Sequence, residues 1–255
     1  MLANERQQKI YEMICEKDAV STSDLVKRLT VSVETVRRDL LELEGKRLLK
    51  RVHGGAIKSG DMRQFFELEE RHKSREAEKR ELTKVAMSVV QERDIISIDS
   101  GSTAIFFANA LKENFSSLTV VTHSLDVFEI LHEHKSFNVI LCAGNYMKKE
   151  NAFYGLLTME TLKQLYVKKA FICPSAVSLE NGIYDYQPDL CMIQRKYMSI
   201  SDKIYILADS SKYEKRALIK LGDMRPEYTY ITDHNLKSDL KMMYLESGMQ
   251  VLTEE

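Results

Sequence analysis

Two adjacent arginines, Arg37 and Arg38, lie in a segment whose residue order is typical of a DNA-contacting helix. Ser32 can cap the start of this helix, because its hydroxyl accepts a backbone N–H that would otherwise lack a partner. The apolar residues that recur at helical spacing and should face a core are Val33, Val36, Leu40 and Leu43. A guanidinium group can bind guanine O6 and N7 through two hydrogen bonds, or can clamp a phosphate. The segment therefore predicts a recognition helix for double-stranded DNA.

An arginine pair alone is more often the solvated face of a surface helix, but here a basic hairpin follows. Residues 48–52 resemble a strand, and Gly54 and Gly55 permit a tight reversal. Nine basic residues stand against four acidic ones between Lys27 and Lys58, which favours attraction to phosphate. A helix is expected over 5–17 and another after residue 23, so residues 1–58 predict a winged helix-turn-helix. The residues expected to contact DNA are Ser32, Thr35, Arg37, Arg38, Lys50, Arg51 and His53.

Beyond residue 82, short β-rich runs alternate with helical patterns. Strands are expected at 95–98, 118–121, 138–141, 170–173, 204–207 and 228–231. Helices are expected near 80–91, 103–113, 124–134, 156–166, 189–200 and 236–247. Such alternation predicts an α/β fold with a mainly parallel sheet covered by helices on both faces.

Polar clusters follow four of these expected strands, at residues 99–103, 122–124, 143–145 and 209–212. The carboxyl ends of parallel strands share one edge of a sheet, which is where α/β domains bind ligands. The first cluster leads into a helix whose N-terminal N–H groups can receive an anion, and a lysine suits phosphate. We therefore expect a pocket for a small phosphorylated polyol. Its expected residues are Asp99, Gly101, Ser102, Thr103, His123, Gly144, Asp209 and Lys212.

Length and charge favour a two-domain protein. The 255 residues exceed what a small DNA-binding module needs. Ser59-Gly60-Asp61 breaks the pattern, so we expect a DNA-binding domain at 1–58, a linker at 59–78, and an effector-binding and oligomerisation domain at 79–255. The net charge of −1 hides the basic excess near the N-terminus.

Other features argue against a membrane protein, a metalloprotein or an enzyme. No apolar run approaches the roughly 18 residues of a membrane span, and MLANERQQKI lacks a signal-peptide pattern, so a cytoplasmic protein is expected. The four cysteines form no CxxC pair, which favours reduced thiols over structural zinc. His123, His132 and His134 lack matching carboxylates for a metal site. No nucleophile elbow, P-loop or GxGxxG is present, so neither a catalytic site nor a cofactor is expected.

The motifs VSVETVRRDLLELE, RVHGGA, DSGST, VVTHS and DSSK give a resemblance to the DeoR family of bacterial transcriptional regulators over essentially the whole chain. The resemblance implies a C-terminal domain similar to ribose-5-phosphate isomerase and glucosamine-phosphate deaminase folds that senses a sugar phosphate. It carries DNA contact to Ser32, Thr35, Arg37 and Arg38. It carries effector contact to Asp99, Gly101, Ser102, Thr103 and Lys212. The sequence departs from the family pattern at His123, where asparagine is usual, and at Ala143 and Ala176, where glycine is usual.

The leading hypothesis is a sequence-specific transcriptional regulator, expected to be a repressor, whose DNA affinity changes when a phosphorylated sugar binds. The modest basic excess suggests that two or more copies act together, as a homo-oligomer, either a dimer or a tetramer. The alternative is a sugar-phosphate isomerase or deaminase tethered to DNA. Isomerisation needs a carboxylate base and a group that stabilises the enediolate; Asp99 could be the base, but no second acid is evident.

Overall fold

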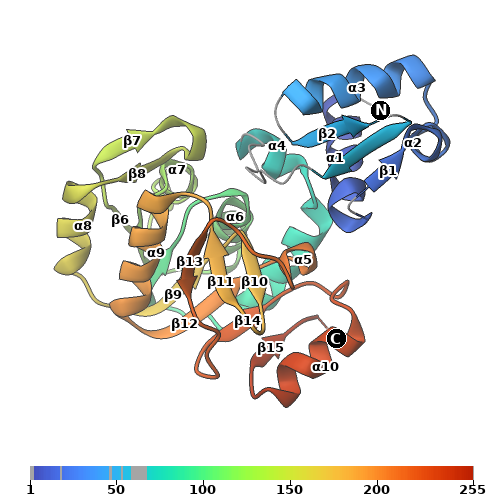
Figure 1. The fold of residues 1–255 in the computed structure, drawn as a ribbon. Coiled ribbons are helices and arrows are strands. Elements are labelled where there is room, and N and C mark those ends of the chain that lie inside the picture. The colour runs from blue at the N-terminus through green and yellow to red at the C-terminus, as the bar shows by residue number, and fades with distance from the viewer. Residues whose placement is uncertain (1–2, 18, 46–47, 53, 59–67, 255) are drawn as a thin grey trace. The chain divides into compact units, whose positions relative to one another are not determined.

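The computed structural model describes residues 3–17, 19–45, 48–52, 54–58 and 68–254 (Figure 1). His53, one of the predicted DNA contacts, lies outside these residues. The chain divides into two compact units, Met1–Glu70 and Arg71–Glu255. The division falls within the segment 59–78 that the sequence analysis treats as a linker, and helix α4 (Leu68–Lys73) spans it.

In the part of the smaller unit that precedes residue 59, the described residues form three helices and a small antiparallel sheet. Its elements are α1 (Ala3–Lys17), β1 (Ala19–Ser21), α2 (Thr22–Leu29), α3 (Val33–Gly45), β2 (Leu49–Val52) and β3 (Gly55–Lys58). The strand order is β1-β3-β2. The hairpin β2–β3 is the predicted wing, with Val52 paired with Gly55 beside the turn. Strand β1 was not predicted.

The predicted helical spacing of α3 places most of its apolar residues in the core. Val36 and Leu43 are fully buried, and Leu40 is 3% exposed. They pack with α1, α2 and the wing through residues such as Ile10, Ile14, Leu25, Leu49 and Ala56. The expectation for Val33 was wrong, since its side chain is 38% exposed. Val33 is the first residue of the helix, and the buried face begins with Val36.

The larger unit is built on a seven-stranded sheet of order β15-β14-β12-β9-β4-β5-β6. Every neighbouring pair in it is parallel. The strands are β4 (Ile95–Ile98), β5 (Thr119–Thr122), β6 (Asn138–Leu141), β9 (Val167–Ile172), β12 (Ser201–Leu207), β14 (Thr229–Ile231) and β15 (Gln250–Leu252). The predicted α/β fold with a mainly parallel sheet is confirmed.

Helices cover both faces of this sheet (Figure 1). They are α5 (Glu76–Met87), α6 (Ser102–Asn114), α7 (Leu125–Leu131), α8 (Leu156–Lys163), α9 (Pro188–Ser199) and α10 (Ser238–Glu246). Successive residues of β9 point to opposite faces, so Ala170 and Ile172 join one core cluster and Phe171 joins the other. Buried strands with apolar residues on both sides are what a doubly covered parallel sheet requires.

Several short elements of the larger unit were not predicted. Strand β15 extends the main sheet, and β7 (Asn145–Met147) pairs with β8 (Ala152–Tyr154) in a hairpin. A second sheet has the order β10-β11-β13, from Ala176–Ser178, Gly182–Asp185 and Ile219–Gly222. Two short 3-10 helices are η1 (Lys148–Glu150) and η2 (Ser210–Lys212). Among the residues described, no helix combines the length and apolar character needed to span a membrane.

Candidate functional sites

The start of α3 is fixed by a reciprocal pair of hydroxyl residues. The Ser32 hydroxyl accepts a hydrogen bond from the Thr35 backbone N–H at 3.1 Å, and the two hydroxyls lie 2.9 Å apart. Ser32 is therefore the N-cap that the sequence predicts, and its side chain orders the first turn of the helix. Both residues lie on the solvent side, where they can also approach a phosphate.

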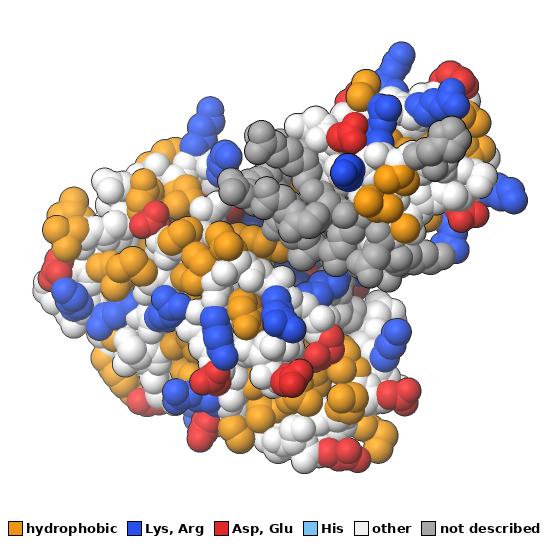
Figure 2. All heavy atoms as spheres, viewed as in Figure 1, with side chains coloured by type: hydrophobic (Ala, Val, Ile, Leu, Met, Phe, Trp, Pro, Cys, Tyr) orange, Lys and Arg blue, Asp and Glu red, His pale blue; other side chains and the backbone are white. Residues whose placement is uncertain are grey.

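The two arginines of α3 lie on its exposed face. Arg37 is 71% exposed, and its Nη1 lies 3.8 Å from Glu34, which is 80% exposed. Such an exposed ion pair is weak, so Arg37 can exchange it for another anion. Arg38 is also exposed. Figure 2 shows several blue Lys and Arg side chains on the surface of the smaller unit.

A buried ion pair, which was not predicted, holds α3 against α1. Asp39 is 2% exposed and accepts hydrogen bonds from Arg6 Nε at 2.5 Å and Arg6 Nη2 at 3.1 Å. The hydrogen bond to Asp39 raises the pKa of Arg6 above its usual value. Gln7 donates to Glu42 at 2.5 Å. The available signal was that Asp39 lies three residues after Val36, on the core side of the helix.

The wing is tied to both neighbouring helices. The Arg51 backbone N–H donates to Glu44 Oε1 at 2.7 Å, and Arg51 Nε lies 3.5 Å from Glu44 Oε2. On the other side, the Thr22 N–H donates to the Gly54 carbonyl at 2.8 Å. An added Cβ at Gly55 would lie 2.1 Å from the Val20 carbonyl oxygen, so only glycine allows β1 to approach β3 this closely. Lys50 remains exposed.

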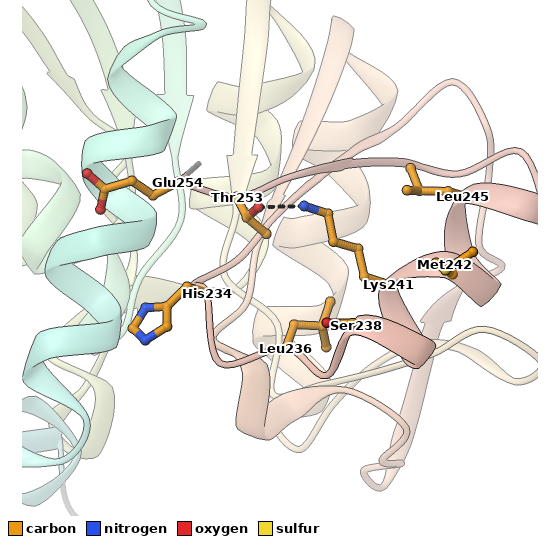
Figure 3. A pocket seen from close by; sticks show the side chains of 8 residues that line it. All are labelled: His234, Leu236, Ser238, Lys241, Met242, Leu245, Thr253 and Glu254. Atoms are coloured by element: carbon orange, nitrogen blue, oxygen red, sulfur yellow. Dashed lines mark hydrogen bonds between the residues drawn. The ribbon is translucent and has the colours of Figure 1, made fainter.

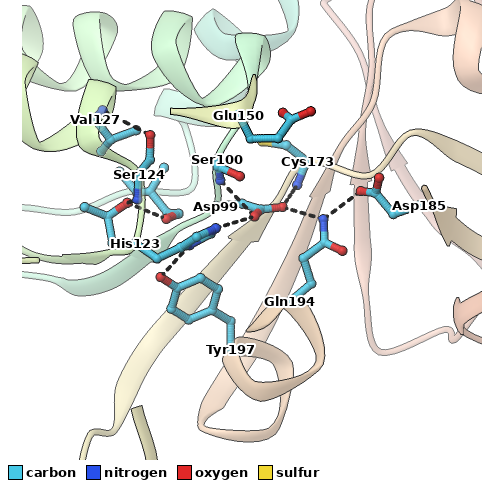
Figure 4. Close-up of polar contacts among 12 residues, drawn as sticks. Asp99, Ser100, His123, Ser124, Val127, Glu150, Cys173, Asp185, Gln194 and Tyr197 are labelled. Carbon is cyan, nitrogen blue, oxygen red and sulfur yellow. Dashed lines mark hydrogen bonds and ion pairs between the residues drawn. The ribbon is translucent and has the colours of Figure 1, made fainter. Parts of the chain in front are cut away.

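In the larger unit, the predicted polar clusters follow β4, β5, β6 and β12 at the carboxyl edge of the main sheet. Asp99 lies at the centre of this edge and is fully buried. Its carboxylate accepts hydrogen bonds from the N–H groups of Ser100 at 2.8 Å and Cys173 at 2.9 Å. Gln194 Nε2 donates to Asp99 at 2.9 Å and to Asp185 at 2.8 Å (Figure 4).

Burial sets the ionisation of two side chains at this edge. It raises the pKa of Asp99 to about 7, although the hydrogen bonds from Cys173 and Gln194 oppose the change. Burial also lowers the pKa of His123 to about 3, so the imidazole is neutral near pH 7. Its Nδ1 lies 3.1 Å from the Tyr197 hydroxyl, and its Nε2 lies 3.9 Å from Asp99 Oδ1. Within the described part of the chain, His123 Nε2 has no hydrogen-bond partner.

The turn after β4 forms the start of α6. Gly101 has φ 97° and caps this helix, and Ser102 and Thr103 are both buried. The backbone N–H groups of a first helical turn lack intrahelical acceptors, and together with the helix dipole they favour an anion. The Thr103 hydroxyl also lacks a partner among the described residues. The turn therefore presents unsatisfied donors at the sheet edge.

Lys212 and Asp209 follow β12 at the same edge. Lys212 Nζ donates to the Pro174 carbonyl at 2.8 Å, just beyond the end of β9. Asp209 is buried, which alone would raise its pKa, but Lys212 and the hydrogen bond from Ser211 bring that pKa below its usual value. Asp209 therefore stays ionised and counters the charge of Lys212.

Gly144 has a packing role in the structure. An added Cβ would lie 2.3 Å from Thr158 Oγ1 and 2.5 Å from the Tyr154 carbonyl oxygen. Its part in an effector site stays a prediction. Three side chains at the edge that the sequence analysis missed are Asp185, Gln194 and Tyr197; all come from segments more than 80 residues after Asp99, so no local motif announces them.

A hollow lies elsewhere in the larger unit, between α10 and the C-terminal segment (Figure 3). Its volume is about 290 Å³. It is lined by His234, Leu236, Ser238, Lys241, Met242, Leu245, Thr253 and Glu254, none of which belongs to the predicted effector site. No cluster of His, Cys, Asp and Glu suited to a metal ion occurs in the parts of the chain described here.

The chain is similar to known proteins over nearly its whole length. The chain is 32% identical to the L-fucose operon activator of Haemophilus influenzae over 240 residues, covering 93% of this chain and 95% of that protein. It is 33% identical to the lactose phosphotransferase system repressor of Staphylococcus epidermidis over 259 residues, covering 98% of each. A solved ribose 5-phosphate isomerase A from Neisseria gonorrhoeae shares 21% identity over 54% of this chain and 53% of that one, with a TM-score of 0.41.

Two family models match the chain directly. A DeoR-like helix-turn-helix domain matches residues 6–59, and a DeoR C-terminal sensor domain matches residues 74–234. The first contains α3 and the wing, and the second contains the sheet edge around Asp99. The predicted family is thus confirmed: the chain belongs to the DeoR family of transcriptional regulators.

Proposed function

We propose that this regulator binds operator DNA through α3 and the β2–β3 wing, and that a phosphorylated sugar at the sheet edge around Asp99 changes the operator affinity. The proposal assigns DNA contact to residues 1–58 and effector binding and oligomerisation to residues 79–255. Ser32, Thr35, Arg37, Arg38, Lys50 and Arg51 are the proposed DNA contacts in the described part of the smaller unit. Because its partner is the bacterial operator, we place the protein in the cytoplasm.

The observation that carries the effector site is the set of unpaired polar atoms at one sheet edge. Thr103 Oγ1, His123 Nε2 and Gln194 Oε1 are buried, and none has a hydrogen-bond partner among the described residues. A buried polar atom without a partner costs about 1–3 kcal/mol, so a ligand with several hydroxyl groups would be stabilised here. Lys212 and the first turn of α6 supply positive charge and N–H donors for its phosphate.

The chemistry of the ligand follows from this geometry and from the relatives. The neutral imidazole of His123 can donate a hydrogen bond to a sugar hydroxyl or accept one from it. Asp99 can orient the same sugar hydroxyl. The relatives' names refer to operons or transport systems for L-fucose and lactose, which supports a sugar phosphate. Those relatives include both an activator and a repressor; we propose repression, relieved by the ligand.

Regulation requires that the ligand bind the DNA-competent and DNA-incompetent states with different affinities. A coupling free energy of about 1–3 kcal/mol is typical. We propose that two copies contact neighbouring half-sites in a dimer or tetramer. Large apolar side chains exposed on the larger unit, including Tyr146, Leu156 and Leu157, support such an association.

The test combines two measurements on the full chain. A thermal-shift screen against phosphorylated sugars should find a ligand that raises the melting temperature, because a ligand that prefers the folded state stabilises it. Gel-shift titration of promoter DNA should then show weaker binding when that ligand is present. Failure to bind promoter DNA at low salt would refute the DNA-binding part, and absence of any stabilising sugar phosphate would refute the effector part.

We further propose that the protein does not catalyse a reaction on its ligand. Asp99 is held in place by hydrogen bonds from Ser100, Cys173 and Gln194. Gln194 also holds the neighbouring carboxyl group of Asp185, so both carboxyl groups take part in hydrogen bonds within the protein. Incubation with sugar phosphates should therefore leave them unchanged. Isomerisation or deamination that disappears in Asp99→Asn would overturn this proposal.

A further inference from the structure

Arg71 lies near the sheet edge around Asp99, the proposed effector site, and at the boundary between the two units along the chain. It lies in α4 and is the first residue of the larger unit. Its Nη1 lies 3.9 Å from the position that a Cβ on Gly101 would occupy, beside the first turn of α6. A guanidinium therefore stands next to the turn that we propose receives the ligand's phosphate.

Glu150 holds this guanidinium. Arg71 Nη2 donates to Glu150 Oε2, and the two side chains are 27% and 14% exposed. Glu150 ends the short helix η1, and the next residues are fixed against the end of β5. Asn151 donates to Asp126 at 2.7 Å, and the Phe153 N–H donates to the His123 carbonyl at 2.8 Å. Figure 4 draws Glu150 with the residues of this edge.

The backbone of Arg71 is fixed separately from its side chain. Lys79, which is 4% exposed, donates through Nζ to the carbonyl oxygens of Arg71 and Ser74. Arg75, the residue after Ser74, has φ 50° and caps α5. The chain at the boundary is thus held by a buried lysine, whereas the Arg71 guanidinium is held by a carboxylate that another anion can replace.

We propose that Arg71 is a phosphate-binding residue of the effector site and that Glu150 is its intramolecular competitor. The inference rests on the proposed function and deepens it. A phosphate monoester carries about −1.5 to −2 charges near pH 7, and a guanidinium binds it through two parallel hydrogen bonds. The phosphate therefore takes Arg71 from Glu150. The largely buried carboxylate of Glu150 then loses its partner. Arg71, on the helix α4 that spans the unit boundary, becomes attached to the ligand.

Calorimetric titration of the full chain with inorganic phosphate and with glucose 6-phosphate tests this exchange. Glu150→Gln removes the competitor and should lower the phosphate Kd about tenfold, the ratio that 1.4 kcal/mol represents. Arg71→Gln should raise the Kd about tenfold. The double variant should match Arg71→Gln alone, because Glu150 acts only through Arg71. Glu160→Gln and Lys163→Gln each remove an exposed ion pair within α8 and serve as controls for the loss of one charge.

A second measurement separates this exchange from a purely structural ion pair. Without ligand, Glu150→Gln should shift operator affinity in the direction in which the ligand shifts the wild-type protein. The inference is overturned if Glu150→Gln leaves the phosphate Kd within about twofold of the wild-type value while Lys212→Ala weakens binding. If Arg71→Gln does not fold, the Glu150→Gln titration decides by itself. If neither probe binds the wild-type protein, the proposed phosphate site itself fails.

Discussion

Lys212 and Pro174 join two neighbouring strand ends at the sheet edge around Asp99. Lys212 Nζ, beyond β12, donates to the carbonyl oxygen of Pro174, beyond β9, at 2.8 Å. Only one of the three ammonium hydrogens is accounted for by this bond. The lysine is therefore positioned by the protein and still has donors for an anion.

Lys212→Ala should leave operator binding intact and abolish its response to a sugar phosphate. The reason is that the variant removes the positive charge at the sheet edge without touching α3 or the wing. Gel-shift titration with and without the ligand identified by thermal shift measures both properties. Lys215→Ala, which removes a nearby exposed lysine, is the matched control. A retained response would show that the phosphate binds elsewhere.

Arg38→Ala should reduce operator affinity by roughly 1–3 kcal/mol and relax the sequence preference at one position of each half-site. This follows if the exposed guanidinium binds a guanine edge, because a bidentate base contact discriminates against the other bases. Titrations against the operator and against single-base variants measure both effects. If Arg38→Ala bound the operator and all single-base variants as tightly as the wild-type protein does, Arg38 would not be a DNA contact.

Lys50→Ala should weaken binding by a similar factor for every DNA sequence. A phosphate contact carries no base preference, and its loss should reduce the slope of log K against log salt by about one. Titrations at several salt concentrations separate this outcome from that of Arg38→Ala. A slope equal to that of the wild-type protein would contradict a phosphate contact from Lys50.

Asp39→Ala should lower the free energy of unfolding of the smaller unit by about 2–4 kcal/mol. Removal of one partner from a buried pair leaves the charge of the other, Arg6, less well compensated. Urea denaturation followed by circular dichroism measures the change. Glu34→Ala on the exposed face of the same helix is the control and should change this free energy by less than about 1 kcal/mol. Equal effects of the two substitutions would refute an anchoring role for Asp39.

Asp99 should make the larger unit less stable as the pH rises from about 4 to about 7. Burial raises the pKa of Asp99 in the folded protein to about 7, whereas an unfolded aspartate titrates near about 3.9. Within this window the folded state binds more protons, so stability falls with increasing pH. His123, with its pKa lowered to about 3, has the opposite effect between about 3 and about 6.5.

The contribution of Asp99 is isolated by comparing Asp99→Asn with the wild-type protein. Thermal denaturation across this pH range should show the melting temperature of the variant rising relative to that of the wild type as pH increases. His123→Asn should show the reverse trend between about pH 4 and about pH 6.5. A difference between Asp99→Asn and wild type that does not change with pH would refute the raised pKa.

Local signals account for what the sequence predicts correctly. The cap at Ser32 and the spacing of Val36, Leu40 and Leu43 lie within a few turns of one helix, and the parallel strands contain short runs rich in β-branched and aromatic residues. The helical spacing and the high β-propensity of each short run depend on nearby residues only. The same reasoning placed the polar clusters at one sheet edge, because that position follows from the strand ends.

Long-range contacts account for what the sequence analysis missed. Strands β1, β7 and β10 have three residues each, too few for a clear alternation, and they exist because distant strands pair with them. Gln194 reaches Asp99 across 95 positions of the chain. The burial of Asp39 likewise depends on Arg6 from another helix. Val33 satisfied the helical spacing but lies at the end of the helix, which a periodic pattern cannot distinguish from its middle.

The double attachment of the wing has a consequence for operator architecture. Glu44 fixes it to α3, and the Thr22–Gly54 hydrogen bond fixes it to α2. These two attachments should hold helix and hairpin in a fixed orientation when they contact DNA. In the proposed assembly, two copies would engage together when both target grooves face the same side of the DNA. Insertion of about half a helical turn, roughly five base pairs, between half-sites should then cost more binding than most single-base changes within them.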